Sequence, residues 1–336
     1  MRYAIQLSYD GSGFCGWQVQ RGAETVQECL ERALSTLLGA PVCVTGAGRT
    51  DTGVHAVGYV AHFDIIDVGA PDPAVLAYKL NAILPPSVVV HAVWPVSPDF
   101  HARFDASQRK YTYFLHRLKD PFAQKYSLRR DWDLDFDAMN RAAALLVGRH
   151  DFACFEKTGT DVKTTVCTVT EAFWAPYVPT HVALMGFGPA APEPAGPAAE
   201  PHRKQKASPL SGNASGMSSS DRPECGCVAG SIPRRDDKLL PATQLHLGPE
   251  WRYVYFRISA DRFLRNMVRA IVGTLLEVGR GKRSVEDFAT LILPVGTSLP
   301  EETAGKRASL RSRAGDSVPG HALFLSKVEY PEVSGL

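Results

Sequence analysis

The sequence predicts an α+β protein whose first half has a ferredoxin-like fold. Residues 1–105 follow the order strand, helix, strand, strand, helix, strand, which is that of a split β-α-β unit. The chain has 336 residues, of which 45% are hydrophobic, so it can bury a large core and form two structural units. We expect these units at residues 1–105 and 106–336.

Periodicity and capping residues mark the elements of the first half. Apolar and polar residues alternate from Tyr3 to Tyr9, which predicts a strand with one buried face. Thr25 and Glu28 have the spacing of a capping box, and the helix that they begin ends at Gly39. Further elements are expected as strands at residues 41–45 and 57–63, a helix at 73–84 and a strand at 88–94.

The second half contains one stretch of different composition. Residues 189–237 are rich in Pro, Ala, Ser and Gly and poor in large apolar residues, which predicts a disordered insertion. The alternating strands on its two sides are expected to pair as a hairpin. A long helix is predicted from Asp261 to Val278, which would place Arg262, Arg265 and Arg269 on one face. The other predicted elements are strands at residues 109–115, 166–174, 251–258 and 321–330, and helices at 135–147 and 284–293.

Composition and charge restrict the function. The formal net charge is +2, so a polyanion would have to bind a local patch of cations. We expect a cytoplasmic protein with no membrane partner, because no apolar stretch could cross a bilayer and the N-terminus lacks the apolar segment of a signal peptide. The seven scattered cysteines favour reduced thiols, and Cys225-Gly226-Cys227 lacks the nearby Cys or His ligands of a metal site.

Residues 46–56 place one carboxylate, Asp51, among glycines and beside Arg49, on a loop between two predicted strands. A plain turn is the simplest interpretation. A dinucleotide fingerprint is excluded because Asp51 occupies the third glycine position, where it would repel a pyrophosphate. An aspartic protease needs a second carboxylate to share a proton, and the chain has no second Asp-Thr-Gly copy. The remaining interpretation has Asp51 alone, as an ionised nucleophile or electrostatic stabiliser at a sugar carbon.

Residues 48–56, Gly-Arg-Thr-Asp-Thr-Gly-Val-His-Ala, resemble the catalytic motif of the tRNA pseudouridine synthase A (TruA) family. The resemblance extends in order along nearly the whole chain, through residues 9–18, 100–104, 109–111, 148–152, 263–273 and 318–325. It implies two ferredoxin-like halves that share one continuous antiparallel sheet flanked by helices, with an active-site cleft between the halves.

The resemblance also implies roles for individual residues. Asp51 matches the catalytic aspartate and Arg269 the arginine that pairs with it. Tyr111 matches an active-site tyrosine near the uracil, Arg49 an arginine that helps to hold the flipped nucleotide, and Leu323 an apolar residue against the base. We expect four basic residues to contact RNA phosphates: Arg103, Arg109, Lys110 and Arg265. For each of them, a solvated position on the surface is the simpler interpretation.

The implied activity is the isomerisation of uridine to pseudouridine at positions 38, 39 and 40 of the tRNA anticodon stem-loop. It needs no metal or cofactor, and the implied assembly is a homodimer that binds tRNA. Two alternatives stay open: a non-catalytic RNA-binding or tRNA-folding protein on the same scaffold, and a synthase for another RNA position. The chain departs from the family's compact form at residues 189–237 and 294–313.

Overall fold

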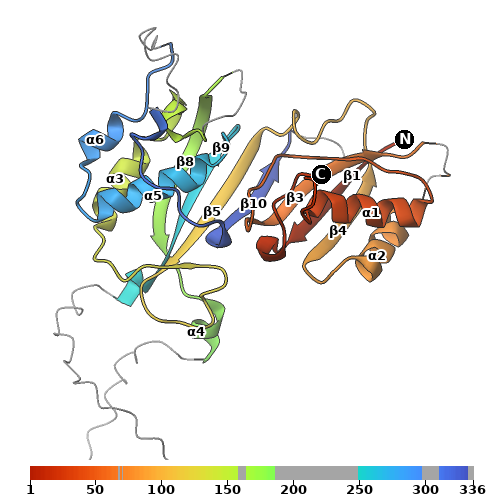
Figure 1. Cartoon of the computed structure of the whole chain (residues 1–336), viewed down its shortest axis with the longest axis horizontal. Coiled ribbons are helices and arrows are strands. Elements are labelled where there is room, and N and C mark those ends of the chain that lie inside the picture. Colours follow the sequence, from red (N-terminus) through yellow and green to blue (C-terminus); the bar gives the residue numbers. More distant parts are fainter. Residues whose placement is uncertain (67–68, 70, 158–163, 186–248, 297–309, 332–336) are drawn as a thin grey trace, which may run out of the picture.

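One ten-stranded sheet runs through both halves of the molecule (Figure 1). The computed structural model describes residues 1–66, 69, 71–157, 164–185, 249–296 and 310–331. The insertion predicted at residues 189–237, with Cys225 and Cys227, lies outside these ranges. None of the described helices is long and apolar enough to cross a membrane.

The first half has the predicted order of elements. It contains β1 (Arg2–Tyr9), α1 (Val26–Leu38), β2 (Val44–Gly46), β3 (His55–Asp64), α2 (Pro73–Ile83) and β4 (Val88–Pro95). The expected caps are present, since the Thr25 side chain accepts a hydrogen bond from Glu28 N and Gly39 ends α1 with φ 70°. Asp72 caps α2, which begins with a proline. The sequence therefore predicts the first half correctly, although β2 is shorter than expected.

The second half repeats this plan with an added edge strand. Its main elements are β5 (Gln108–His116), α3 (Phe136–Ala144), β7 (Gly148–Asp151), β8 (Val166–Pro176), β9 (Tyr253–Ala260), α5 (Met267–Gly279), α6 (Val285–Ala289) and β10 (Leu323–Glu329). Shorter pieces are β6 (Leu128–Arg129), α4 (Thr180–Met185) and 3-10 turns at Gly11–Gly13, Ala153–Phe155, Pro249–Arg252 and Gly320–Ala322. The sequence patterns do not predict β7 or α4.

The two halves have the same strand order. In the first half, β4, β1 and β3 are neighbours and β2 pairs with the outer edge of β3. In the second half, the order is β10-β5-β9-β8, followed by β7. When the strands of each half are numbered by their order in the sequence of that half, they lie side by side in the order fourth, first, third, second. This is the order of a ferredoxin-like unit. Neighbouring strands are antiparallel, as predicted, except for β10 with β3 and β5 with β6.

The outer edge of β3 is where the halves join. β2 covers one part of this edge at Phe63, and β10 covers another at His55 and Ala56. The segment that connects β2 to β3, residues 47–54, contains Asp51, and we call it the Asp51 loop. It therefore lies beside the seam between the halves.

The helices of each half cover that half's own strands, with α1 and α2 on one and α3, α5 and α6 on the other (Figure 1). Two large hydrophobic clusters result, one for each half, and a small third cluster packs Ala4 and Val60 with Phe100 and Ala102. Strand β10 contributes to both large clusters, because Leu325 is buried in the cluster of the first half and Leu323 in the cluster of the second half. Tyr111 packs against both clusters and so marks the seam. The division of the chain at residue 105 stays a prediction.

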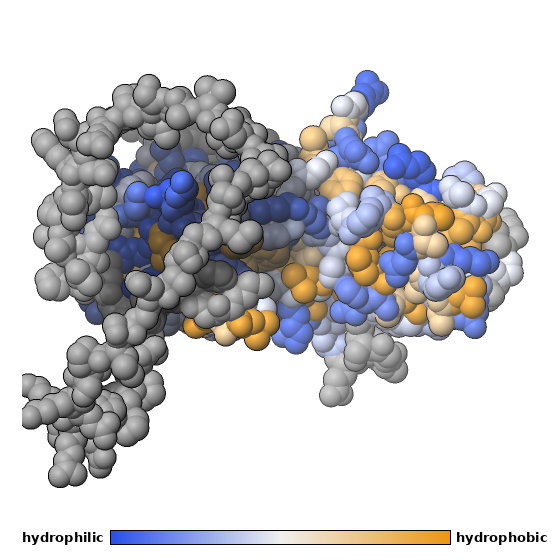
Figure 2. Space-filling model, turned by 90° about the horizontal axis from the view of Figure 1, so that it is seen from below, coloured by the Kyte–Doolittle hydropathy of each residue, from blue (hydrophilic) through white to orange (hydrophobic). Residues whose placement is uncertain are grey.

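The surface of the first half is apolar in places. Seen from below, orange residues gather over this half (Figure 2). On α2, the side chains of Val75, Tyr78 and Ile83 are exposed. The helix therefore carries apolar side chains outward as well as toward the core.

The long helix predicted from Asp261 was wrong at its start. Residues 261–266 form a loop, and α5 begins at Met267 after Asn266, which has φ 65°. The Asp261 carboxylate accepts hydrogen bonds from Thr168 N and Arg262 N, so it ties the loop to β8 instead of capping a helix. Arg262 and Arg265 consequently do not share a helix face with Arg269.

Candidate active site

The Asp51 loop is held against the segment that follows β1. The buried Tyr9 hydroxyl and Thr50 Oγ1 are 2.8 Å apart. Trp17 N donates to Thr50 O at 3.2 Å, and Gly53 N donates to Phe14 O at 3.4 Å. The stretch that resembles the family over residues 9–18 therefore supports, through Tyr9, Phe14 and Trp17, the loop that carries Asp51.

The backbone of Gly11 approaches the Asp51 loop closely. A Cβ atom at this position would lie 2.1 Å from Val54 O, which is far inside van der Waals contact. Gly11 N also donates to His55 Nδ1 at 3.0 Å. The missing side chain thus lets two backbone segments touch at the end of the loop.

Asp51 is paired with Arg269 from the other half of the molecule. Arg269 Nη1 lies 3.1 Å from Asp51 Oδ2, and the two side chains are 23% and 25% exposed. Arg269 Nε donates to Val318 O at 2.7 Å, which fixes the guanidinium in a second direction. An ion pair that is partly removed from water orients the carboxylate while a substrate can still reach it.

An aromatic and apolar surface lies beside this pair. Tyr111 on β5 makes an edge-to-face contact with Phe263, with ring centroids 5.1 Å apart. Burial raises the pKa of the Tyr111 phenol, and the negative charge of Asp51 raises it further, so the hydroxyl keeps its proton at neutral pH. Leu323, on the neighbouring strand β10, is 4% exposed. Asp51, Tyr111 and Leu323 all line one cleft of about 1480 Å³.

The cleft is bordered by more cations than carboxylates. Its acidic lining residues are Asp51 and Asp261, whereas the basic ones are Arg49, Arg103, Arg109, Lys157, Arg262, Arg265 and Arg269. A local cationic patch of this kind suits a polyanion, although the net charge of the chain is small.

Arg109 lines the cleft but directs its guanidinium at backbone oxygens. Nη1 donates to Ala106 O at 2.8 Å and to Asp261 O at 2.7 Å. Nη2 donates to Ala47 O at 3.0 Å and also to Arg103 O. Arg109 therefore joins the Asp51 loop to the second half, and little of its donor capacity is left for a phosphate.

The structure does not bring Lys110 into the cleft. Successive residues of a strand point to opposite faces, so Lys110 lies on the face of β5 opposite to Tyr111. Its Nζ is 3.5 Å from Glu171 Oε2 on β8. The other predicted site residues all line the cleft: Asp51, Arg269, Tyr111, Arg49, Leu323, Arg103, Arg109 and Arg265.

Sequence reasoning missed Phe263 as a neighbour of Tyr111 and Arg109 as a link between the halves. Both depend on where the loop before α5 lies, and no local pattern reports this. Within the described ranges, no group of three or more His, Cys, Asp or Glu residues is arranged to hold a metal ion.

Comparison with known proteins agrees with this geometry. A family model described as tRNA pseudouridine synthase matches residues 5–105 and 142–331. The tRNA pseudouridine synthase A of Bacteroides thetaiotaomicron is 40% identical over 331 residues, which cover 98% of this chain and 91% of the relative. That of Porphyromonas gingivalis is 38% identical, with 98% and 97% covered. That of Solidesulfovibrio magneticus is 36% identical, with 100% and 94% covered.

Proposed function

The chain belongs to the tRNA pseudouridine synthase family, and from this premise we propose that it isomerises uridine at positions 38, 39 and 40 of the tRNA anticodon stem-loop. It is an enzyme of the isomerase class. The observation that carries the proposal is the ion pair of Asp51 with Arg269, at the seam of a cleft bordered by arginines.

Asp51 is the proposed catalytic residue. In the reaction the bond from N1 of uracil to C1′ of the ribose breaks, a bond from C5 to C1′ forms, C5 loses its hydrogen as a proton, and N1 gains a proton. An ionised carboxylate serves both routes to base detachment, by attack on C1′ or by removal of a proton from the ribose. Arg269 is proposed to pair with the Asp51 carboxylate and keep it aimed at the sugar.

Tyr111 and Leu323 are proposed to contact the detached uracil. Tyr111 offers a ring face with a protonated hydroxyl, and Leu323 offers an apolar side chain. Uridines within a stem must leave the base stack before they reach Asp51, which costs a few kcal/mol. Arg49, two residues before Asp51, is proposed to help to hold the flipped nucleotide.

The proposed phosphate contacts are revised by the geometry. Arg103 and Arg265 are exposed at the cleft and keep this role. Arg109 is better described as a link between the halves, and Lys110 lies outside the cleft.

We also infer a homodimer in the cytoplasm. Light scattering of the purified protein would test the dimer, and cell fractionation would test the location.

The test is release of tritium from tRNA that carries 5-tritiated uridine. Pseudouridine formation replaces the hydrogen at C5, so the label enters water only if isomerisation occurs. We expect release by the native chain and none by Asp51→Asn, with the circular dichroism spectrum and tRNA binding of the variant unchanged. Substrates that keep a uridine at only one of positions 38, 39 and 40 then identify the targets. Tight binding without release from any tRNA would instead favour a binding or folding protein.

A further inference from the structure

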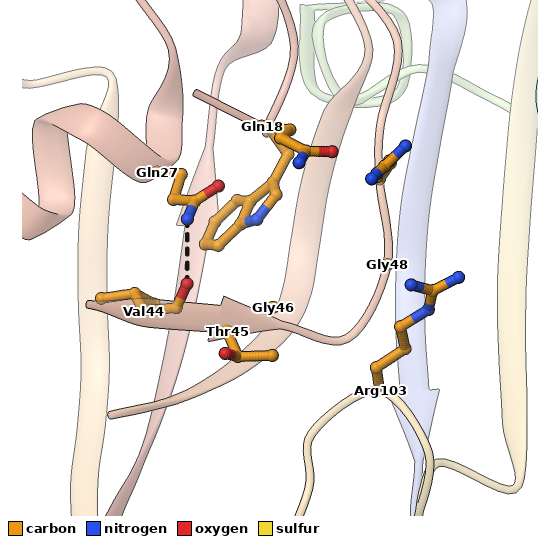
Figure 3. Close-up of a pocket in the computed structure, with 9 residues that line it drawn as sticks. Gln18, Gln27, Val44, Thr45, Gly46, Gly48 and Arg103 are labelled. Atoms are coloured by element: carbon orange, nitrogen blue, oxygen red, sulfur yellow. Dashed lines mark hydrogen bonds between the residues drawn. The ribbon is translucent and has the colours of Figure 1, made fainter. Parts of the chain in front are cut away.

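A second pocket, of about 200 Å³, lies beside the cleft at the Asp51 loop (Figure 3). Its lining comes from the segment after β1, from α1, from β2, from the Asp51 loop and from Arg103. Gln18, Gly48, Arg49 and Arg103 line both this pocket and the cleft. A group bound here would therefore be a close neighbour of a group bound at Asp51.

One wall of the pocket is fixed by bonds within the protein. Gln27 Nε2 donates to Val44 O at 3.0 Å and to Glu31 Oε1 at 2.9 Å, and Gln27 Oε1 accepts from Val19 N (Figure 3). The polar atoms of Gln27 are thus already used, and this wall is a rigid boundary.

The opposite rim carries polar groups that no described residue engages through the side chain. The Gln18 amide and the guanidinium groups of Arg49 and Arg103 make no side-chain hydrogen bond or ion pair with any residue that the structure describes. Arg103 only lies over the Phe104 ring, 5.6 Å from its centroid. In Figure 3, Gln18 and Arg103 extend toward the loop at Gly48 from two different segments. The pocket lining contains no carboxylate, so the two cations suit a phosphate and the amide suits the edge of a base.

The pocket is lined by two glycines, Gly46 and Gly48, and packing requires a glycine at only one of these positions. At Gly46 a Cβ atom would lie 2.1 Å from the Tyr59 hydroxyl oxygen, so packing requires the glycine. At Gly48 a Cβ atom would meet nothing within 4 Å, and φ is not in the left-handed region. Neither the backbone nor the packing requires Gly48, and its missing side chain leaves open space next to Arg49.

We propose that this pocket binds one nucleotide of the RNA adjacent to the flipped uridine, with its phosphate on Arg49 and Arg103 and its base edge on Gln18. The proposal rests on the proposed function. The uridine that reacts must lie with Asp51, Tyr111 and Leu323, none of which lines this pocket. A volume of about 200 Å³ lies below the range for drug-sized ligands, so the pocket has room for one base but not for a stack. A neighbour held here sets which uridine of the anticodon arm reaches Asp51.

The first experiment fills the pocket. Gly48→Leu is compared with Gly13→Leu, because Gly13 also has an ordinary φ and no atom within 4 Å of a built Cβ, but lines neither cavity. We expect Gly48→Leu to raise KM for tRNA by ~10-fold or more in the tritium assay, as loss of a charge-assisted contact does. Gly13→Leu should keep the native KM. Equal KM values for the two variants would overturn the proposal, whereas no release by the native chain would overturn the proposed function itself.

The second experiment removes the phosphate contact without changing the loop. In an Asp51→Asn background, the binding of tRNA ethylated at single phosphates is measured with and without Arg103→Gln. Arg103 is exposed, so we expect the variant to keep its fold, and circular dichroism checks this. We expect ethylation of one phosphate within about two nucleotides of the target to weaken binding to the parent, and to weaken binding to Arg103→Gln by a smaller factor, because only Arg49 then remains to contact that phosphate. An equal loss in both proteins at every phosphate near the target would contradict a contact with Arg103. Gln18→Ala should reduce discrimination among bases next to the target, measured as the ratio of kcat/KM for tRNAs that differ only at that base.

Discussion

Arg269 Nη1 and Asp51 Oδ2 are 3.1 Å apart, although the two residues are separated by 218 positions in the chain. Asp51 lies on a loop of the first half and Arg269 in the first turn of α5, in the second half. The pair therefore forms only when the two halves pack as they do here. Arg269 also donates from Nε to Val318 O, so its direction does not depend on Asp51.

The first prediction concerns the two bonds of Arg269. Arg269→Gln should lower kcat for tritium release by ~100-fold, since it removes a charge-assisted bond and the positive charge beside Asp51. Arg269→Lys should retain more activity than Arg269→Gln but less than the native chain, because one ammonium cannot reproduce the fork that reaches both Asp51 and Val318. Native kcat in Arg269→Gln, with an unchanged melting temperature, would remove Arg269 from the mechanism.

The sequence predicts some parts of this site better than others. Asp51 could be identified locally, because glycines and an arginine surround it within a few residues. The strands and helices that position it follow from alternation and from capping signals such as the box at Thr25. The start of α5 could not be found in this way. The sequence near Asp261 fits a helix cap equally well, and only the partner Thr168 N, on a distant strand, decides against it.

Arg109 and Lys110 illustrate the same limit. Both are basic residues at the start of a strand, and the sequence gives them the same role. The strand places them on opposite faces, where Arg109 meets four carbonyl oxygens and Lys110 meets Glu171. Spacing predicts the direction of a side chain along a strand, but not which acceptors the rest of the fold brings to it.

The second prediction uses this pair as a matched comparison. Arg109→Gln should lower the free energy of unfolding by about 2–4 kcal/mol, because it leaves carbonyl oxygens of the seam without their donor. Lys110→Gln should change it by less than about 1 kcal/mol, since it removes one ion pair near the surface. Urea denaturation followed by circular dichroism measures both. If the two variants were equally stable, Arg109 would not be the link that its hydrogen bonds indicate.

The third prediction concerns pH. Burial, aided by the positive charges of Arg2 and His101, lowers the pKa of His62 to about 4, and its Nδ1 accepts from Ala102 N at 3.1 Å. The unfolded chain binds a proton on this residue below about pH 6.5, while the folded chain does so only near pH 4. Stability should therefore fall as the pH decreases through this window, by about 2 kcal/mol for His62 between pH 7 and pH 5.

His62→Asn tests this contribution. The asparagine oxygen can accept the Ala102 bond but does not titrate, so urea unfolding of the variant should lose less stability between pH 7 and pH 5 than that of the native chain. Some slope should remain, because burial also lowers the pKa of His55, His116 and His321. An identical slope in both proteins would show that His62 is not protonated on unfolding in this range.

The last prediction separates the position of the Asp51 loop from the chemistry of Asp51. Gly11→Ala would place a Cβ atom 2.1 Å from Val54 O, and Val54 N donates to Asp51 O at 3.1 Å. The loop must move to relieve this contact, so we expect kcat to fall by ~10-fold or more and stability to fall by about 1–3 kcal/mol. Gly13→Ala, whose Cβ meets nothing within 4 Å, should change neither quantity. Tritium release and urea denaturation are measured on the same samples. A loss of stability with native kcat would make the contact between Gly11 and Val54 purely structural. A fall in kcat that is larger than the loss of stability explains would show that this contact sets the orientation of Asp51.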